Sequence, residues 1–228
     1  MNKELKLKKK FTLIEMLVVI TIIAILVSIL LPSLSAAKRK SYMAVCKSNQ
    51  RQIYLGATTF SKNNKGKIVL AGYSGYKLSY DDFLSPYIGK QLSTADMNLT
   101  HPDVESGVYK CPESPFTKVT NNGAVRSYSM NTGLNWASSS FTGITTENGG
   151  HSSFMTELDN TSSLLFLGER NNSENARGYG RSSGMAFVNN GVLGKSIHLK
   201  NRYFMFIMAD GHAEYLHEGE AAANHRDR

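Results

Sequence analysis

The chain lacks the short motifs on which most enzymes depend. Its two cysteines do not form the Cys-x-x-Cys pair of a zinc or redox site. It contains no glycine loop of the phosphate-binding pattern and no Gly-x-Ser-x-Gly nucleophile elbow. The regularly spaced aspartates of a calcium loop are absent, and so are internal repeats. We therefore predict that the protein is not an enzyme.

Charge is almost absent from one long stretch. Residues 11–31, FTLIEMLVVITIIAILVSILL, contain Glu15 as their only charged residue. A helix needs about 20 apolar residues to cross the hydrocarbon core, and a lone segment in lipid has to be helical. A carboxylate within such a span is costly and usually marks a function. We therefore predict a transmembrane helix over residues 11–31 in which Glu15 has a specific role.

Two other interpretations of this stretch stay open. A secretory signal has an apolar core of about 7 to 15 residues, which is shorter than this one. Residues 34–37, Leu-Ser-Ala-Ala, nevertheless have the small side chains of a signal cleavage site. A plain signal anchor explains the hydrophobicity but leaves Glu15 without a role.

The segment KKKFTLIEMLVVITIIAIL resembles the processing and methylation segment of type IV prepilins and type II secretion pseudopilins. The resemblance implies that residues 1–10 are a basic leader, which a prepilin peptidase/methyltransferase removes before it methylates Phe11. It also implies that the helix holds the subunit in the inner membrane until the subunit joins others in a filament. Glu15 would then neutralise the amine of a neighbouring subunit's Phe11 and set the stagger between packed helices.

One residue departs from the family pattern. Family members usually have glycine before the cut, whereas this chain has Lys10. A peptidase pocket shaped for a residue without a side chain accommodates lysine badly. Cleavage between Lys10 and Phe11 therefore requires a permissive peptidase.

The basic residues are concentrated near the predicted membrane. Residues 1–60 carry ten Lys and Arg against two acidic residues, whereas residues 61–228 carry sixteen of each. The surplus of positive charge in residues 1–60 can therefore bind anionic lipid of the inner membrane. The head has no net charge, which argues against nucleic acid as its partner. Basic residues flank the span on both sides, so charge alone does not orient it. The family resemblance implies a cytoplasmic N-terminus, a periplasmic head and, after assembly, a filament that can reach the cell surface.

The helix is expected to continue beyond the span. Pro32 predicts a bend or a local melt. An apolar stripe with helical spacing follows, and it consists of Tyr42, Cys46, Asn49, Ile53, Gly56 and Phe60, with Val45 and Ala57 beside it. Turn residues over 63–66 end the pattern. We predict one helix over residues 11–60, whose second half packs against the head.

The rest of the chain predicts an α+β fold, in which the long helix packs against a small antiparallel β-sheet head. The expected organisation is a leader (1–10), a transmembrane helix (11–31), its amphipathic continuation (32–62), the head (63–217) and a polar, frayed tail (218–228). Within the head we expect a short helix (80–88), a loop (90–108), strands (126–131 and 164–167), two polar stretches of which the first is an exposed insertion (132–155 and 171–183), and a hairpin (203–216). Asp210-Gly211 supplies the turn of that hairpin.

Several segments of the head resemble a pseudopilin-like group that carries a C-terminal His-x9-Asp-Gly processing-associated motif. The matches, in order, are Cys46 with Asn49, residues 82–87, Lys110-Cys111-Pro112, residues 126–131, residues 164–169 and residues 209–212. Eleven residues rather than nine separate His198 from Asp210, so His198 departs from the motif.

Few residues of the head suggest a site. His198, Asp210 and His212 are metal-ligand types, but their spacing does not make them converge, and surface histidines beside a turn explain them more simply. Calcium is implied only by resemblance to some pseudopilin heads, and we expect no other cofactor. Glu169 ends a buried strand, where a salt bridge to a nearby arginine is the commoner arrangement.

Cys46 and Cys111 allow a single intramolecular pairing, which would attach the head to the helix. A periplasmic location favours the disulfide, whereas two separate buried thiols are the alternative. The resulting hypothesis is a structural subunit of a type IV pilus-like or secretion pseudopilus filament. The alternative is an envelope enzyme or a glycan-binding module that shares only the anchor.

Overall fold

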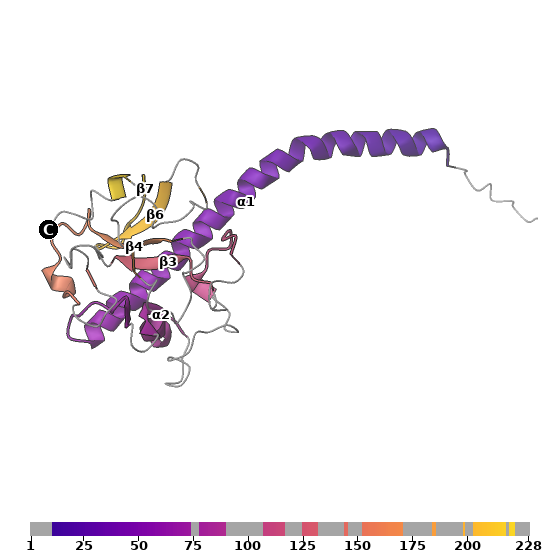
Figure 1. Ribbon diagram of the computed structural model, residues 1–228. Helices are drawn as coiled ribbons and strands as arrows, with labels where there is room; N and C mark the ends of the chain where they lie inside the picture. The colour runs from indigo at the N-terminus through magenta and orange to yellow at the C-terminus, as the bar shows by residue number, and fades with distance from the viewer. Residues whose placement is uncertain are drawn as a thin grey trace, which may run out of the picture. The chain divides into compact units, whose positions relative to one another are not determined.

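The computed structural model describes residues 11–73, 78–89, 107–116, 125–131, 144–145, 152–170, 184–185, 198, 203–217 and 219–221. The chain divides into two compact units, Met1–Ser41 and Tyr42–Arg228. Figure 1 shows the helices and strands of both units. The predicted loop at 90–108 falls almost entirely outside the described residues, and the polar stretch at 171–183 does so completely.

Helix α1 (Leu13–Asn63) confirms the long helix that the sequence predicts. Its helical backbone passes Pro32 without interruption, so a local melt at this residue is wrong. A single proline removes one hydrogen bond, and the intact turns on both sides keep the helix formed. The helix ends where expected, because Lys65 and Gly66 take positive φ values of 56° and 85° that a helix cannot continue.

The part of α1 after Ser41 buries one face in the head. The buried residues are Cys46, Asn49, Gln50, Ile53, Gly56, Ala57 and Ser61. The predicted stripe is thus confirmed, with Tyr42 and Phe60 half-buried at its two ends. Val45, placed beside the stripe, is 41% exposed, so that assignment is wrong. The buried face is centred one residue further along the helix than the predicted stripe, and it therefore includes Gln50.

The head contains a five-stranded sheet in the order β5-β3-β4-β6-β7. The strands are β3 (Tyr128–Asn131), β4 (Leu165–Glu169), β5 (Gly184–Met185), β6 (Tyr203–Met208) and β7 (Ala213–His217). Four of them pair antiparallel, which confirms the predicted α+β layout, whereas β5 pairs parallel with β3 and was not expected. A separate two-stranded sheet joins β1 (Gly72–Tyr73) and β2 (Leu78–Ser79).

Strands β6 and β7 form the predicted hairpin. The Gly211 N–H donates to the Met208 carbonyl oxygen at 2.9 Å, and the Met208 N–H donates to the His212 carbonyl oxygen at 2.9 Å. Gly211 takes a φ of 90°, which L side chains rarely adopt. The Asp-Gly signal in the sequence therefore located the turn correctly.

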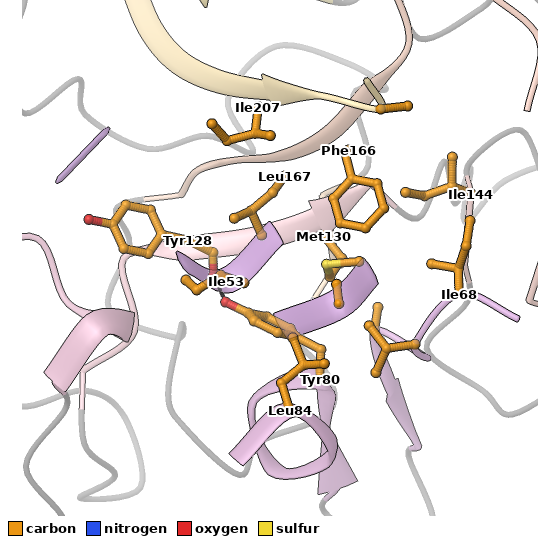
Figure 2. Close-up of a cluster of buried hydrophobic side chains, with 14 of the residues drawn as sticks. Ile53, Ile68, Tyr80, Leu84, Tyr128, Met130, Ile144, Phe166, Leu167 and Ile207 are labelled. Carbon is orange, nitrogen blue, oxygen red and sulfur yellow. Dashed lines mark hydrogen bonds between the residues drawn. The ribbon is translucent and has the colours of Figure 1, made fainter. Parts of the chain in front are cut away.

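Side chains are buried on both faces of the sheet. On one face, α1 and α2 (Tyr80–Leu84) pack against strand residues, and Figure 2 shows Ile53 of α1 among Leu167, Tyr128 and Tyr80. On the other face a smaller cluster contains Leu165, Phe204, Phe206, Met208, Leu216 and Ala221. Ala221 lies in a helical turn over residues 219–221, so the predicted frayed tail is wrong at this point.

Helix α2 and the 3-10 helix η1 (Ser85–Tyr87) confirm the short helix predicted at 80–88. Asp82 Oδ2 accepts from the Ser79 N–H at 2.8 Å and so caps the start of α2. Asp81 Oδ1 lies 2.5 Å from the Arg126 guanidinium, with both side chains fully buried. Since Arg126 stands just before β3, this ion pair attaches α2 to the sheet.

The predicted exposed insertion at 132–155 is wrong where the structure describes it. Ile144 and Thr145 are completely buried, and Thr145 pairs with Ser152 in an isolated bridge. The Thr145 hydroxyl also donates to the Val69 carbonyl oxygen at 2.9 Å. This two-residue segment has no detectable periodicity in the sequence, so its burial could not be read from the pattern.

Candidate membrane and assembly site

The first turns of α1 expose apolar side chains in all directions. Among the described residues, α1 is the one helix that is both long enough and apolar enough to cross a membrane. The signal sequence of a secreted protein passes the same test. From Leu13 to Leu34 the large apolar side chains of α1 are exposed. An apolar surface of this extent needs lipid or protein to cover it.

The polar side chains in this part of the helix bond to the helix itself. The Thr21 hydroxyl donates to the Leu17 carbonyl oxygen at 2.7 Å, and the Ser28 hydroxyl donates to the Ile25 carbonyl oxygen at 2.7 Å. Hydroxyl groups bonded in this way can enter lipid without leaving an unsatisfied donor. Glu15 is therefore the one residue of this stretch whose burial in lipid needs a special explanation.

Glu15 forms a capping box with Thr12. Its Oε2 atom accepts from the Thr12 N–H at 2.8 Å and from the Thr12 hydroxyl at 2.7 Å, while the Glu15 N–H donates to the Thr12 hydroxyl oxygen at 3.3 Å. This local role has a signal in the sequence, because Thr-x-x-Glu before an apolar run is a known signature of a helix start.

The capping box uses only one oxygen of the Glu15 carboxylate. Among the described residues, no hydrogen bond reaches Oε1. Phe11, expected to become the new amino terminus, is 69% exposed and directly precedes the box. Lys10, the other residue of the predicted cleavage site, lies outside the described residues. Helix capping and an outside partner for Glu15 are therefore compatible.

In the head, Cys46 of α1 and Cys111 form a disulfide with a Cα–Cα distance of 5.3 Å. The sequence left open a disulfide or two separate buried thiols, and the structure contains the disulfide. The bond joins α1 to the segment that precedes β3 across a sequence separation of 65. In the chain-entropy account, a loop of this length stabilises the fold by about 4 kcal/mol.

A buried histidine and two carboxylates lie beside the disulfide. His198 Nε2 is 3.1 Å from Cys111 Sγ and 3.3 Å from Glu169 Oε1, and His198 Nδ1 is 2.8 Å from Glu113 Oε2. Burial alone would lower the pKa of His198, but Glu169 and Glu113 outweigh it, so this pKa is raised above its usual value. Glu169 therefore pairs with a histidine, where the sequence had suggested an arginine.

The three predicted metal candidates do not meet. Asp210 and His212 flank the hairpin turn, with His212 Nδ1 2.6 Å from Asp210 Oδ1, and both are exposed. Among the described residues, the only metal-capable group contains His198 with the two cysteines, and it includes neither Asp210 nor His212. The simpler interpretation of Asp210 and His212, a turn with flanking surface side chains, fits this arrangement.

Fold and site together define an α+β protein whose N-terminal helix is apolar and exposed over its first half. Comparisons of the chain with family models, curated proteins and solved structures find no match. The functional conclusion therefore depends on the residues described above.

Proposed function

We propose that the protein is a structural subunit of a type IV pilus-like or type II secretion pseudopilus filament. The observation that carries this proposal is the composition of α1. Its first half exposes apolar side chains on all sides around a single carboxylate, Glu15, and the same helix then supplies the buried Cys46–Ser61 face of the head. A membrane-anchored enzyme or glycan-binding module could share this first half, but a plain anchor would leave Glu15 without a role.

Before assembly, residues 11–31 hold the subunit in the inner membrane. This arrangement places the short N-terminus in the cytoplasm and the head in the periplasm. The Cys46–Cys111 disulfide supports the periplasmic location, because disulfides persist in oxidising compartments. Assembly then exchanges lipid around the helix for the helices of neighbouring subunits, which is close to neutral for apolar side chains.

Glu15 gives the assembly its register. An unpaired carboxylate within lipid or within a helix bundle is costly, so it favours the one stagger that brings a cation to it. The Oε1 atom, which accepts no hydrogen bond from the described residues, is suited to accept one from the amine of a neighbouring Phe11, while Oε2 stays in the Thr12 capping box. This role requires cleavage between Lys10 and Phe11, since only cleavage creates that amine.

Intact-mass analysis of the chain from its own envelope tests the proposal. We expect a mass that begins at Phe11 and carries one added methyl group, in a fraction that is released by shearing or pellets with filaments. A Lys10→Gly variant, which restores the family's residue, should be cleaved at least as completely. A chain that begins at Met1 or beyond residue 34, and that never enters a filament fraction, would contradict the proposal.

A further inference from the structure

We propose that the reduced protein has a metal site for a thiophilic divalent cation of the zinc class, formed by Cys46, Cys111, His198 and Glu169. The site lies in the head and does not depend on filament assembly. Oxidation of the two thiols to the Cys46–Cys111 disulfide removes the site.

Ligand atoms from three distant parts of the chain converge at this point. The two sulfur atoms and a ring nitrogen of His198 lie within 4.8 Å of one another, and all three residues are buried. His198 Nε2 faces Cys111 Sγ at 3.1 Å and Glu169 Oε1 at 3.3 Å. Two sulfurs, a nitrogen and an oxygen form a tetrahedral zinc set when the thiols are deprotonated.

The other nitrogen of His198 is already held as in known zinc sites. Its Nδ1 atom is 2.8 Å from Glu113 Oε2. Metal-binding histidines almost always donate their second ring N–H to a carboxylate or a carbonyl, which fixes the ring and leaves the first nitrogen free to bind. Glu113 is thus expected to orient His198, while Nε2 is directed at the sulfurs.

A buried carboxylate next to the His198 ring supplies the fourth ligand. Glu169 is 1% exposed, and its Oε1 atom pairs with His198 Nε2 at 3.3 Å. Within the part of the chain that the structure describes, its Oε2 atom accepts a long hydrogen bond of 3.4 Å from the Met205 N–H. A metal bound to His198 Nε2 would replace the proton on that nitrogen and keep a positive charge beside Glu169 Oε1.

The chemistry of the ligands selects the metal. Thiolate and imidazole ligands suit zinc, whereas calcium and magnesium require a set of oxygen ligands. With Zn–S bonds of about 2.3 Å in a tetrahedron, the sulfur atoms would lie about 3.8 Å apart. The Cα–Cα distance of 5.3 Å allows this separation by side-chain rotation.

Metal binding and the disulfide exclude each other. Two thiols release two protons when they bind the cation. A low-molecular-weight disulfide can then accept two electrons from the thiolates, so that the Cys46–Cys111 bond forms and the cation is released, while the two halves of the reagent take up two protons from the solvent and leave as thiols. Conversely, a phosphine reductant with water converts the protein disulfide to two thiols and becomes the phosphine oxide. Both states attach α1 to the segment before β3.

Cobalt(II) titration of the full-length chain in detergent tests the site. The chain is reduced with a phosphine, freed of metal and titrated with cobalt, while the sulfur-to-cobalt charge-transfer band and the visible bands of tetrahedral cobalt are recorded. We expect one cobalt per reduced chain, its displacement by zinc, and no such bands for the oxidised chain. The Cys46→Ser/Cys111→Ser chain should show no charge-transfer band.

Two variants separate a built site from adventitious thiol binding. Glu113→Gln should bind cobalt about 10- to 100-fold more weakly, as expected when the carboxylate that orients a ligand is lost. His198→Gln should lose more, while His212→Gln, a change at an exposed histidine, should bind as the unaltered chain does. Circular dichroism identifies variants that have not folded. Equal affinities for all three variants, or no cobalt bands in the reduced chain, would overturn the proposal.

Discussion

Tyr54 lies directly against Gly211, so the long helix and the hairpin turn fit together only because residue 211 has no side chain. A Cβ atom on Gly211 would lie 2.6 Å from Tyr54 Cε1. The Tyr54 hydroxyl donates to the Ala209 carbonyl oxygen at 2.7 Å, and its ring meets Phe166 edge-on with centroids 5.1 Å apart. The hairpin therefore packs on α1 through the turn that closes it.

Gly211→Ala should destabilise the head through both backbone strain and the clash with Tyr54. The strain of an L residue at a φ of 90° costs about 1 to 2 kcal/mol, and displacement of Tyr54 adds to it. Gly89→Ala is a matched control, because Gly89 has a φ of 83° but no atom of the described residues lies within 4 Å of the added Cβ. Thermal melting followed by circular dichroism should show the larger loss for Gly211→Ala. Equal losses of melting temperature in the two variants would mean that the Tyr54 side chain can move aside without a cost in stability.

Ile53→Asp should disrupt the packing of α1 against the rest of the head. Ile53 is completely buried, and an unpaired carboxylate in the core costs several kcal/mol. Leu55→Asp makes the same change on the same helix at a side chain that is 55% exposed, so it should cost about 0.5 kcal/mol or less. Urea unfolding of both variants in detergent measures the difference. Similar midpoints would contradict the burial of Ile53.

Loss of the Cys46–Cys111 bond should lower the free energy of unfolding by about 4 kcal/mol. The comparison is between oxidised and reduced protein with a strong chelator present, so that no metal compensates for the bond. Alkylation of unreduced, denatured protein gives a direct check, because neither cysteine should react. Two alkylated cysteines in that experiment would show that the bond is not formed in solution.

Three variants distinguish helix capping from charge pairing at the start of α1. Glu15→Gln keeps a side chain that can complete the capping box but removes the charge, so it should insert in the membrane normally and fail to assemble. Thr12→Ala removes the cap and keeps the charge, so it should still assemble. Glu15→Ala removes both the charge and the carboxylate of the capping box, and this variant should insert in the membrane at least as well as the native chain. If Glu15→Gln forms filaments while Thr12→Ala does not, the role of Glu15 is capping alone.

Much of the fold could be predicted because its signals are local. The period of the apolar residues located α1 and its buried stripe, and Asp210-Gly211 located the hairpin. Strand β5 was missed because two residues are too short to show a pattern. Ile144 and Thr145 were missed because they lie within a polar region, and their burial depends on contacts with residues elsewhere in the chain, such as that of Thr145 with Val69.

The buried group around His198 could not be predicted. His198 lies 85 residues from Glu113 and 87 residues from Cys111 along the chain, and no motif connects these residues. Only the folded sheet brings them together. The capping box is the opposite case, since the Thr12-x-x-Glu15 pattern is visible in the sequence and predicts the start of the helix.

The central claim is that the exposed half of α1 packs against copies of itself, with Glu15 setting the register. Site-specific photo-crosslinking in the native envelope tests it most directly. A benzophenone amino acid replaces Leu26, which is 55% exposed in the apolar half, and Leu55, equally exposed in the head, serves as the control position. The account predicts a ladder of chain multiples from position 26 that disappears in the Glu15→Gln background. Crosslinks from position 26 only to lipid or to unrelated proteins, or a ladder unchanged by Glu15→Gln, would contradict it.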